Sequence, residues 1–242
     1  MAPVADDGVP VEKNGVRGFL LAPREGVERG LVLTHGAGGN CSSPLVLAVA
    51  RAFHGAGLAV LRCDLPFRQA RPTGPPSPGK SAADRAGLKA AVEFLQSLAK
   101  AAVYLGGTSY GGRQASILAA EEPDLAAGLL LLSYPLHPPG KPEQLRVQHF
   151  PKLQTPAVFV QGTADPFGSI AELRQAIAAI PAPRQILTVE GAGHELARGR
   201  FDLKPIVAAL LETPARDARA PKGSPARLGA KARPGVHRRA ST

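Results

Sequence analysis

Ser109 is the residue of this chain with the clearest potential for chemistry. It lies in the run VYLGGTSYGG at positions 103–112, where Gly107 and Gly111 stand two residues to either side of it. The pattern predicts an apolar strand, a sharp turn at the serine and a helix over 114–121, with glycines where Cβ atoms would clash. We call this turn the elbow, and the strand and helix beside it the elbow strand and the elbow helix. The helix would direct its N-terminal amides at an oxyanion forming beside the turn. These features indicate a nucleophile, although the pentapeptide alone fits equally well a turn in which Ser109 only caps the helix.

A candidate acid and a candidate base follow two later strands. Asp165 stands in GTADPFG, just past the apolar run 156–161, and His194 stands in GAGH, just past the predicted strand Arg184–Val189. Because parallel strands end at the same edge of a sheet, we expect both side chains beside Ser109. His194 would accept the serine proton and return it to the leaving group, while Asp165 would fix the imidazole tautomer.

Other acids and histidines are weaker candidates for these roles. Asp64 follows the predicted strand 58–63 on the far side of the elbow strand, so we expect a structural role for it. Glu195 adjoins His194 and would point away from it. His137 and His149 lie in the segment 135–155 without a carboxylate placed to orient them, so both are predicted to be surface or rim residues.

The glycine-rich run HGAGG at 35–39 follows the apolar strand Gly30–Thr34. Glycines past a buried strand leave backbone amides free, which is how one donor of an oxyanion hole is built, although an ordinary strand-to-helix loop has the same composition. The amide of Tyr110, directly after the nucleophile, is the other candidate donor. Arg113, in the first turn of the elbow helix, could either brace that turn or bind an acidic substrate.

Three arginines lie in or beside the segment 64–80, DLPFRQARPTGPPSPGK, which is too rich in proline and glycine to predict a helix or strand. The segment leaves the carboxyl end of a parallel strand, where ligands of open α/β sheets bind. Arg62, Arg68 and Arg71 are therefore either solubilising surface charge or a clamp for an anionic substrate group.

The order of predicted elements indicates an α/β fold. Val9–Lys13 and 16–22 flank Asn14–Gly15 and predict an antiparallel hairpin. Buried strands then alternate with helices, which predicts a mostly parallel central sheet with helices on both faces. The short segment 135–155 leaves room only for a minimal cap, so the pocket should be shallow and open. The remaining elements are expected as strands at 127–134 and 156–161 and helices at 44–54, 81–100, 169–180 and 204–211.

Charge is distributed unevenly along the 242 residues. Residues 214–242 carry eight basic side chains and one acidic one, so they contribute +7 of the formal net charge of +10. The remainder is nearly balanced, which argues against a DNA-binding domain. We therefore predict a catalytic domain over 1–213 and a basic, disordered tail over 214–242, dispensable or with a weak hold on polyanions.

Cys41 and Cys63 are the two cysteines. They are too few for a disulfide framework and lack metal-ligand spacing, so we expect two buried thiols in a cytoplasmic protein, with no metal. The N-terminus resembles no secretory leader, and no apolar run reaches the roughly 20 residues that a membrane span needs.

The chain order Ser109, Asp165, His194 resembles the α/β-hydrolase superfamily over residues 9–213. The combination LTHGAGG, GTSYGGR, LHPPGKPEQLR and VQGTADPFG is more narrowly similar to the bacterial branch of the dienelactone-hydrolase-like group that includes the KANL3/Tex30 family. The resemblance implies that Ala37 is the second oxyanion donor and that His35 braces its loop. It implies a serine hydrolase for a small ester, thioester or lactone, without cofactor. The alternative is a non-catalytic interaction module on the same fold.

Overall fold

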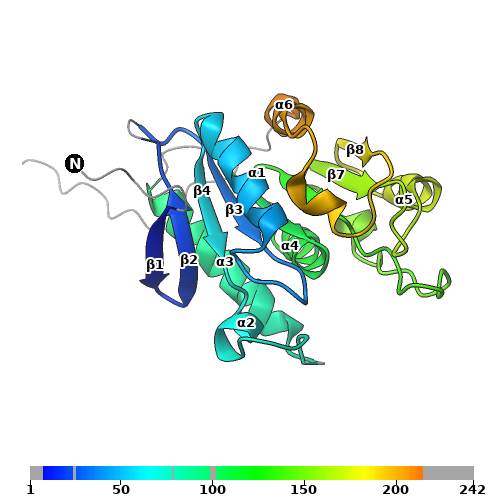
Figure 1. The fold of residues 1–242 in the computed structure, drawn as a ribbon, viewed down its shortest axis with the longest axis horizontal. Coiled ribbons are helices and arrows are strands. Elements are labelled where there is room, and N and C mark those ends of the chain that lie inside the picture. Colours follow the sequence, from blue (N-terminus) through cyan, green and yellow to red (C-terminus); the bar gives the residue numbers. More distant parts are fainter. Residues whose placement is uncertain (1–7, 24–25, 78, 99–101, 215–242) are drawn as a thin grey trace, which may run out of the picture.

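One eight-stranded sheet organises the molecule (Figure 1). The computed structural model describes residues 8–23, 26–77, 79–98 and 102–214. The strand order is β1-β2-β4-β3-β5-β6-β7-β8, in which the β1·β2 and β2·β4 pairs are antiparallel and the others parallel. The predicted fold class is confirmed. The strands are β1 (Val9–Lys13), β2 (Val16–Leu21), β3 (Gly30–Thr34), β4 (Ala59–Cys63), β5 (Val103–Thr108), β6 (Leu129–Leu132), β7 (Ala157–Gly162) and β8 (Arg184–Val189).

The N-terminal hairpin forms as predicted around Asn14 and Gly15. Both have positive φ, 53° and 78°, as a two-residue turn that follows the strand twist requires. Lys13 pairs with Val16 directly across the turn. The hairpin extends the parallel part of the sheet at its β4 edge.

Helices cover both faces of the sheet, as predicted. On β3, Leu31 and Leu33 pack with α1 and α6, whereas Val32 packs with the opposite layer of α3, α4 and α5. This alternation follows from the two-residue period of a strand. The helices are α1 (Pro44–Gly55), α2 (Pro66–Ala70), α3 (Ser81–Leu98), α4 (Tyr110–Glu121), α5 (Ile170–Ile177) and α6 (Lys204–Glu212), with 3₁₀ turns at Phe150–Lys152 and Leu196–Gly199.

Helix α2 corrects the prediction that the segment 64–80 holds no helix. Pro66 occupies the first turn, where its fixed φ suits a helix and its missing N–H costs nothing. The next amide, that of Phe67, donates to the buried carboxylate of Asp84 at 3.0 Å. A side chain from α3 thus satisfies the helix start, which local composition does not reveal.

Helix α4 begins at Tyr110, four residues earlier than predicted. Its first turn contains Gly111 and Gly112, which are poor helix formers. Close packing explains them, since a Cβ on Gly111 would collide with the His35 carbonyl and one on Gly112 would lie 2.6 Å from the Gly107 oxygen. Tertiary packing therefore outweighs propensity here.

The remaining predictions for the chain ends and the cap are only partly covered by the structure. Helix α3 ends at Leu98, and the predicted residues 99–100 lie outside the described part. Apart from Pro214, so does the predicted tail 214–242. The cap segment 135–155 contains a single 3₁₀ turn among its described residues. No described helix is both long and apolar enough to cross a bilayer.

Candidate active site

Ser109 lies at a strained turn between β5 and α4. Its φ and ψ are 48° and −116°, a conformation that non-glycine residues seldom adopt. A Cβ on Gly107 would lie 2.8 Å from backbone atoms of the α4 start, so the turn closes only with glycine there. The Ser109 side chain makes no capping hydrogen bond to α4. The turn thus presents the hydroxyl away from the helix instead of using it as a cap.

The structure brings Ser109, His194 and Asp165 together at the carboxyl edge of the sheet. Ser109 Oγ lies 2.8 Å from His194 Nε2, and His194 Nδ1 lies 2.9 Å and 3.0 Å from the two Asp165 oxygens. Nδ1 can donate to the carboxylate only when it carries the proton, which leaves Nε2 as the acceptor for the serine proton. The geometry therefore suits general-base activation of Ser109.

Asp165 is held by two further donors. Its carboxylate accepts from Gln161 Nε2 at 2.9 Å and from the Phe167 amide at 2.9 Å. Gln161 is itself fixed, because its Oε1 accepts from the Tyr134 amide at 2.9 Å. Sequence reasoning missed Gln161, although a polar residue closing the apolar run PAVFVQ four positions before the acid was a usable signal.

The imidazole of His194 packs against an aromatic ring. The Phe167 and His194 ring centroids lie 4.0 Å apart with an interplanar angle of 29°. Because Phe167 N also binds Asp165, one short loop positions both the acid and the base. Stacking and hydrogen bonding together restrict rotation of the imidazole away from Ser109.

The loop 36–39 contributes the Ala37 amide to the cavity that contains Ser109. The Gly36 carbonyl accepts from His35 Nδ1 at 2.8 Å and from the Gly39 amide at 3.1 Å. A trans peptide points its N–H opposite to its C=O, so the Ala37 N–H faces the other way. Ala37 and Tyr110 both line the cavity that contains Ser109, and neither amide donates to another described residue.

His35 holds this loop from inside the protein. The Leu65 amide donates to His35 Nε2 at 3.1 Å, which places the ring proton on Nδ1 for donation to the Gly36 carbonyl. Burial lowers the pKa of His35, so the neutral ring is favoured. The side chain has no contact with Ser109 in this arrangement and acts as a brace.

Arg68 binds backbone and lies outside the cavity lining, contrary to the expectation that it contacts substrate. The guanidinium donates to Ala37 O at 2.8 Å, Gly39 O at 2.8 Å, Gly74 O at 3.0 Å and Arg71 O at 3.2 Å. Its side chain is buried, and the four carbonyls occupy its donors. The clamp that the sequence suggested is therefore formed on the loop of Ala37, not on an anionic ligand.

A buried carboxylate supports Tyr110. Asp84 Oδ2 accepts from the Tyr110 hydroxyl at 2.6 Å, while its Oδ1 accepts from the Phe67 amide. Asp84 lies in the first turn of α3 and is only 1% exposed. This contact fixes the side chain of the residue whose amide is the second candidate oxyanion donor. Sequence analysis gave Asp84 no role.

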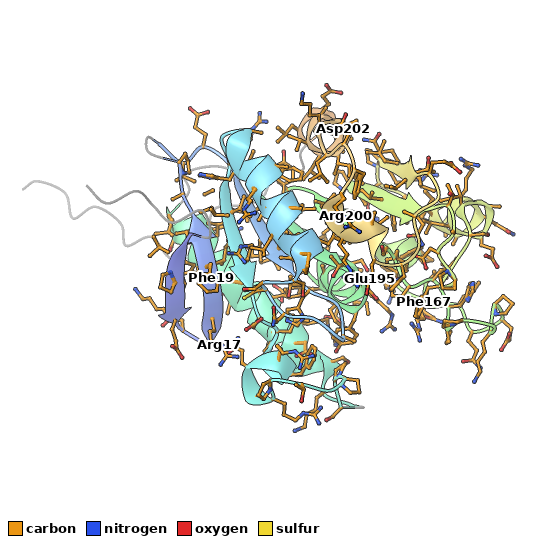
Figure 2. The ribbon with its side chains drawn as sticks, viewed as in Figure 1. Arg17, Phe19, Phe167, Glu195, Arg200 and Asp202 are labelled. Carbon is orange, nitrogen blue, oxygen red and sulfur yellow. The ribbon has the colours of Figure 1, made fainter. Side chains whose placement is uncertain are left out.

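A cavity of about 900 Å³ opens over Ser109 and His194. It is lined by the loop 36–39, the start of α1, the proline pair 75–76, the elbow, and residues from the cap and from the 3₁₀ turn Leu196–Gly199. Phe167 and Glu195, labelled in Figure 2, both belong to this lining. The volume lies within the range of small-molecule sites.

The comparison with known families agrees with this architecture. The profile of a family described as "Alpha/beta hydrolase domain" matches residues 27–204, well over half of the chain. The chain belongs to this family. The matched range contains every strand of the parallel sheet and the residues Ser109, Asp165 and His194.

Solved structures similar to this α/β hydrolase domain share its fold at low sequence identity. A dienelactone hydrolase from Anabaena variabilis is 21% identical with a TM-score of 0.64, and the match covers 84% of this chain and 93% of that one. Est1E from Butyrivibrio proteoclasticus, solved with ferulic acid bound, is 17% identical with a TM-score of 0.66, covering 84% and 96%. An α/β serine hydrolase homologue from Coxiella burnetii is 16% identical with a TM-score of 0.66, covering 86% and 99%.

Three other charged residues of the α/β hydrolase domain have partners in the structure: Asp64, Glu195 and Arg62. Asp64 accepts from the Cys41 amide at 2.8 Å, on the β4 side of the elbow strand and away from β8. Glu195 accepts from Arg198 at 2.8 Å, and His194 donates to Asp165 and not to Glu195. Arg62 donates to the Cys41 carbonyl at 2.6 Å and is 1% exposed, so it forms no part of the cavity.

The prediction that His137 and His149 are surface or rim residues is wrong for His137, which is buried. His137 is 5% exposed, with Nδ1 at 2.8 Å from the Pro138 oxygen and Nε2 at 3.6 Å from Glu172. His149 is half-buried, with Nε2 at 2.8 Å from Ser116 Oγ. Burial, followed by the positive charge of Arg113, lowers the pKa of His149 to about 4. The His149 imidazole thus attaches the cap segment to α4 of the hydrolase domain.

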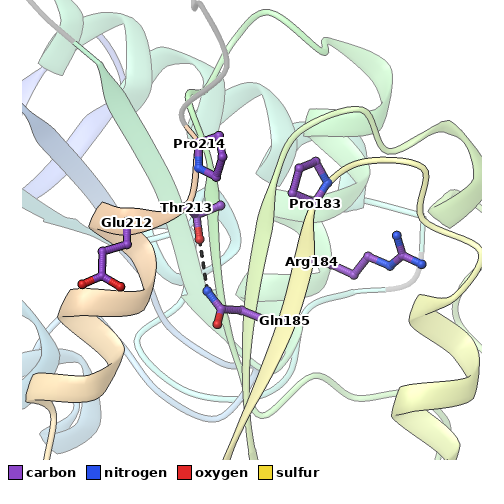
Figure 3. Close-up of a pocket in the computed structure, with 6 residues that line it drawn as sticks. All are labelled: Pro183, Arg184, Gln185, Glu212, Thr213 and Pro214. Atoms are coloured by element: carbon purple, nitrogen blue, oxygen red, sulfur yellow. Dashed lines mark hydrogen bonds between the residues drawn. The ribbon is translucent and has the colours of Figure 1, made fainter.

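Other features of the α/β hydrolase domain do not include Ser109, Asp165 or His194. A hollow of about 320 Å³ is formed where β8 begins and α6 ends, and Gln185 Nε2 donates there to Thr213 at 3.1 Å (Figure 3). Cys41 and Cys63 are free and buried, as expected. The described residues contain no group of three or more His, Cys, Asp or Glu side chains that could hold a metal ion.

Proposed function

We propose that this protein is a serine hydrolase that cleaves a small ester, thioester or lactone through a covalent acyl-enzyme. The observation that carries the proposal is the continuous hydrogen-bonded chain from Ser109 Oγ through His194 to Asp165, located in a cavity large enough for a small molecule. The resemblance to dienelactone hydrolases and esterases adds support at the level of fold. The narrower placement in the KANL3/Tex30 group and a cytoplasmic location are part of the same proposal.

Acylation of Ser109 is the first half of the cycle. His194 Nε2 accepts the hydroxyl proton as Ser109 Oγ attacks the carbonyl carbon, and the amides of Ala37 and Tyr110 stabilise the oxyanion. Each such donor contributes on the order of 100-fold or more in rate. The tetrahedral intermediate collapses, the bond to the leaving oxygen or sulfur breaks, and His194 returns its proton to that atom.

Deacylation repeats the same steps with water. His194 accepts a proton from water, the hydroxide oxygen adds to the acyl carbon, and the bond to Ser109 Oγ breaks as the serine regains a proton. The products are a carboxylic acid and an alcohol or thiol, or a hydroxy acid from a lactone. Asp165 stays ionised and stabilises the imidazolium in both halves.

Labelling with a fluorophosphonate probe tests the proposal, because the probe reacts with an activated serine. We expect the wild type to label, with peptide mapping to Ser109, and the Ser109→Ala and His194→Ala variants to remain unlabelled. Ser97→Ala is a control, since Ser97 is an exposed serine of α3 that donates to the Phe94 carbonyl at 2.6 Å and does not line the cavity. It should label as the wild type does.

The outcome also separates the proposal from its main alternative. A folded wild type that remains unlabelled and hydrolyses no short p-nitrophenyl ester or thioester would favour a non-catalytic interaction module. Label on another serine would contradict the assignment of Ser109. Circular dichroism of each variant checks that loss of label does not reflect unfolding.

A further inference from the structure

Arg113 and Arg146 extend into the cavity beside the proposed nucleophile from two different elements. Arg113 lies in the first turn of α4, four residues after Ser109, and Arg146 lies in the cap segment. Both line the cavity that holds Ser109 and His194. The two side chains are close enough for the charge of Arg113 to act on Arg146.

Neither guanidinium has a partner in the described part of the chain. No hydrogen bond or ion pair joins the Arg113 or Arg146 side chain to another described residue, and Arg113 Nε is buried without an acceptor. Arg68 differs sharply, since four backbone carbonyls accept from it. A buried, unsatisfied guanidinium nitrogen is costly, so its retention beside the nucleophile points to a ligand that supplies the acceptor.

The backbone around Arg146 is fixed. Its amide donates to the Leu136 carbonyl at 2.8 Å, and its carbonyl accepts from the buried hydroxyl of Tyr134 at 2.8 Å. Three residues on, His149 contacts Ser116 Oγ. The cap segment therefore holds Arg146 at a defined position over the elbow, as a preorganised binding group requires.

A second hydrogen bond ties this network to Arg113. Ser116 Oγ donates to the Arg113 carbonyl at 2.9 Å while it contacts His149 at 2.8 Å. The helix that presents Arg113 and the segment that presents Arg146 are thus joined through one serine. These hydrogen bonds position the backbone of Arg113 relative to the cap segment that carries Arg146.

The charges along the cavity leave a net positive site. The charged side chains of the lining include three arginines, Arg113, Arg146 and Arg198, but only one carboxylate, Glu195. This carboxylate accepts from Arg198 at 2.8 Å. Burial, followed by the nearby charge of Arg113, lowers the pKa of Arg146. The N-terminus of α4 adds further positive potential at Ser109. No described acidic side chain neutralises Arg113 or Arg146.

We propose that Arg113 and Arg146 bind an anionic oxygen group, a carboxylate or a phosphate, carried by the substrate of this site. The proposal deepens the proposed function and rests on it. A guanidinium pair matches the planar or tetrahedral acceptors of these groups and would hold the reactive carbonyl at Ser109. The preferred substrates are therefore negatively charged esters or thioesters, and neutral esters of equal length should be poorer ones.

The test compares p-nitrophenyl hemiglutarate with p-nitrophenyl valerate, which have acyl chains of equal length but differ in the terminal carboxylate. Spontaneous hydrolysis is subtracted, and the measured quantity is the ratio of the two kcat/KM values. We expect the wild type to favour the hemiglutarate at least tenfold. Arg113→Gln and Arg146→Gln should each lower the ratio about tenfold, and the ratio should fall as salt is raised. Arg174→Gln, which removes an exposed charge on α5 away from the cavity, is the control and should keep the wild-type ratio.

Inhibition of valerate hydrolysis by free glutarate and by inorganic phosphate distinguishes the two anions. Competitive inhibition by glutarate that weakens in both variants supports a carboxylate, and the same pattern with phosphate supports a phosphate. Equal ratios in wild type and variants, together with no inhibition by either anion, would overturn the proposal while valerate hydrolysis still showed an active hydrolase. If fluorophosphonate labelling and valerate hydrolysis are both absent, the proposed function itself has failed.

Discussion

Replacing Arg68 by lysine should weaken both the fold and the proposed reaction, although the residue touches neither Ser109 nor the cavity. Arg68 donates to carbonyls of the loop 36–39 through two nitrogens and to two carbonyls of the segment 71–74. Lysine keeps the charge but presents a single ammonium on a different geometry. It cannot reach both pairs of carbonyls at once.

The size of the effect follows from the bonds that are lost. A hydrogen bond to a charged donor contributes about 1.5–3 kcal/mol, and lysine should lose at least two of the four, partly replaced by its own contacts. We expect the free energy of unfolding to fall by about 3 kcal/mol. The Ala37 carbonyl would lose its partner, so the neighbouring loop and its amide would shift. Complete loss of an oxyanion donor costs roughly 100- to 1000-fold, and a partial shift should lower kcat about 10- to 100-fold.

Urea denaturation and steady-state kinetics on p-nitrophenyl valerate measure the two effects. Arg71→Lys is a matched control, because Arg71 is an exposed arginine in the same segment that donates mainly to the Pro75 carbonyl at 2.6 Å. It should change the free energy of unfolding by less than about 0.5 kcal/mol, as typical surface substitutions do. Unchanged stability and kcat in Arg68→Lys, with a raised KM only for anionic esters, would refute the reasoning and return Arg68 to the role of a substrate ligand.

Three further predictions follow from buried or paired groups. Asp165→Asn should lower kcat about 10⁴-fold, because an amide cannot orient and stabilise the imidazolium as a carboxylate does; near wild-type kcat in a folded variant would contradict this. Asp84→Asn leaves one acceptor oxygen where the Tyr110 hydroxyl and the Phe67 amide both donate. Thermal denaturation should show that the free energy of unfolding falls by about 1–3 kcal/mol. Burial lowers the pKa of His149 to about 4, whereas the pKa of histidine in the unfolded chain is about 6.5. As the pH falls, the unfolded chain therefore binds this proton before the folded protein does. The free energy of unfolding of the wild type should fall by up to about 3 kcal/mol between pH 7 and pH 4. His149→Gln, which still offers Ser116 a hydrogen-bond partner, should lose less over that range, and an equal loss would contradict the assignment.

The sequence was sufficient to predict the fold and the meeting of three residues at one edge of the sheet. Ser109, Asp165 and His194 each follow an apolar run closely, and parallel strands bring such positions together. The pairing of Gly162 with Val189 places the loops of Asp165 and His194 side by side, and Thr108 pairs with Leu132 at the same level. A contact between strand ends can be inferred in this way because strand order and direction determine it.

The roles of the arginines could not be predicted by the same reasoning. From the sequence, Arg68 was either surface charge or part of a clamp for an anion, and Arg113 either braced the turn or bound an acidic substrate. The partners of Arg68 are backbone carbonyls, and those of the loop 36–39 lie 29 and 31 positions away along the chain. Since every residue has a carbonyl, the sequence contains no sign of which ones converge. Only the path of the backbone in the folded protein shows which carbonyls converge on Arg68.

The partner of His149 in the cap segment could not be predicted, for a related reason. The prediction looked for a carboxylate to orient His149, but its partner is the hydroxyl of Ser116 on α4. A serine in the middle of a helix is common and has no sequence signature. Side-chain pairs between a loop and a helix depend on how the loop crosses the helix, which short-range patterns do not determine.

The arginines of this site form two groups, because the donors of some are occupied by backbone carbonyls and those of others are not. Substitutions in the two groups should have different effects. Arg68 has its donors occupied by carbonyls, so its substitution should disturb the loop of Ala37 and affect every substrate alike. Arg113 and Arg146 have no such acceptors among the described residues, so their substitution should change which substrates are preferred. Arg146 belongs to the short cap and lies outside the sheet, the elbow and the loop 36–39. Changes at position 146 should therefore alter selectivity at little cost to folding, whereas changes at position 68 should impair catalysis on every ester.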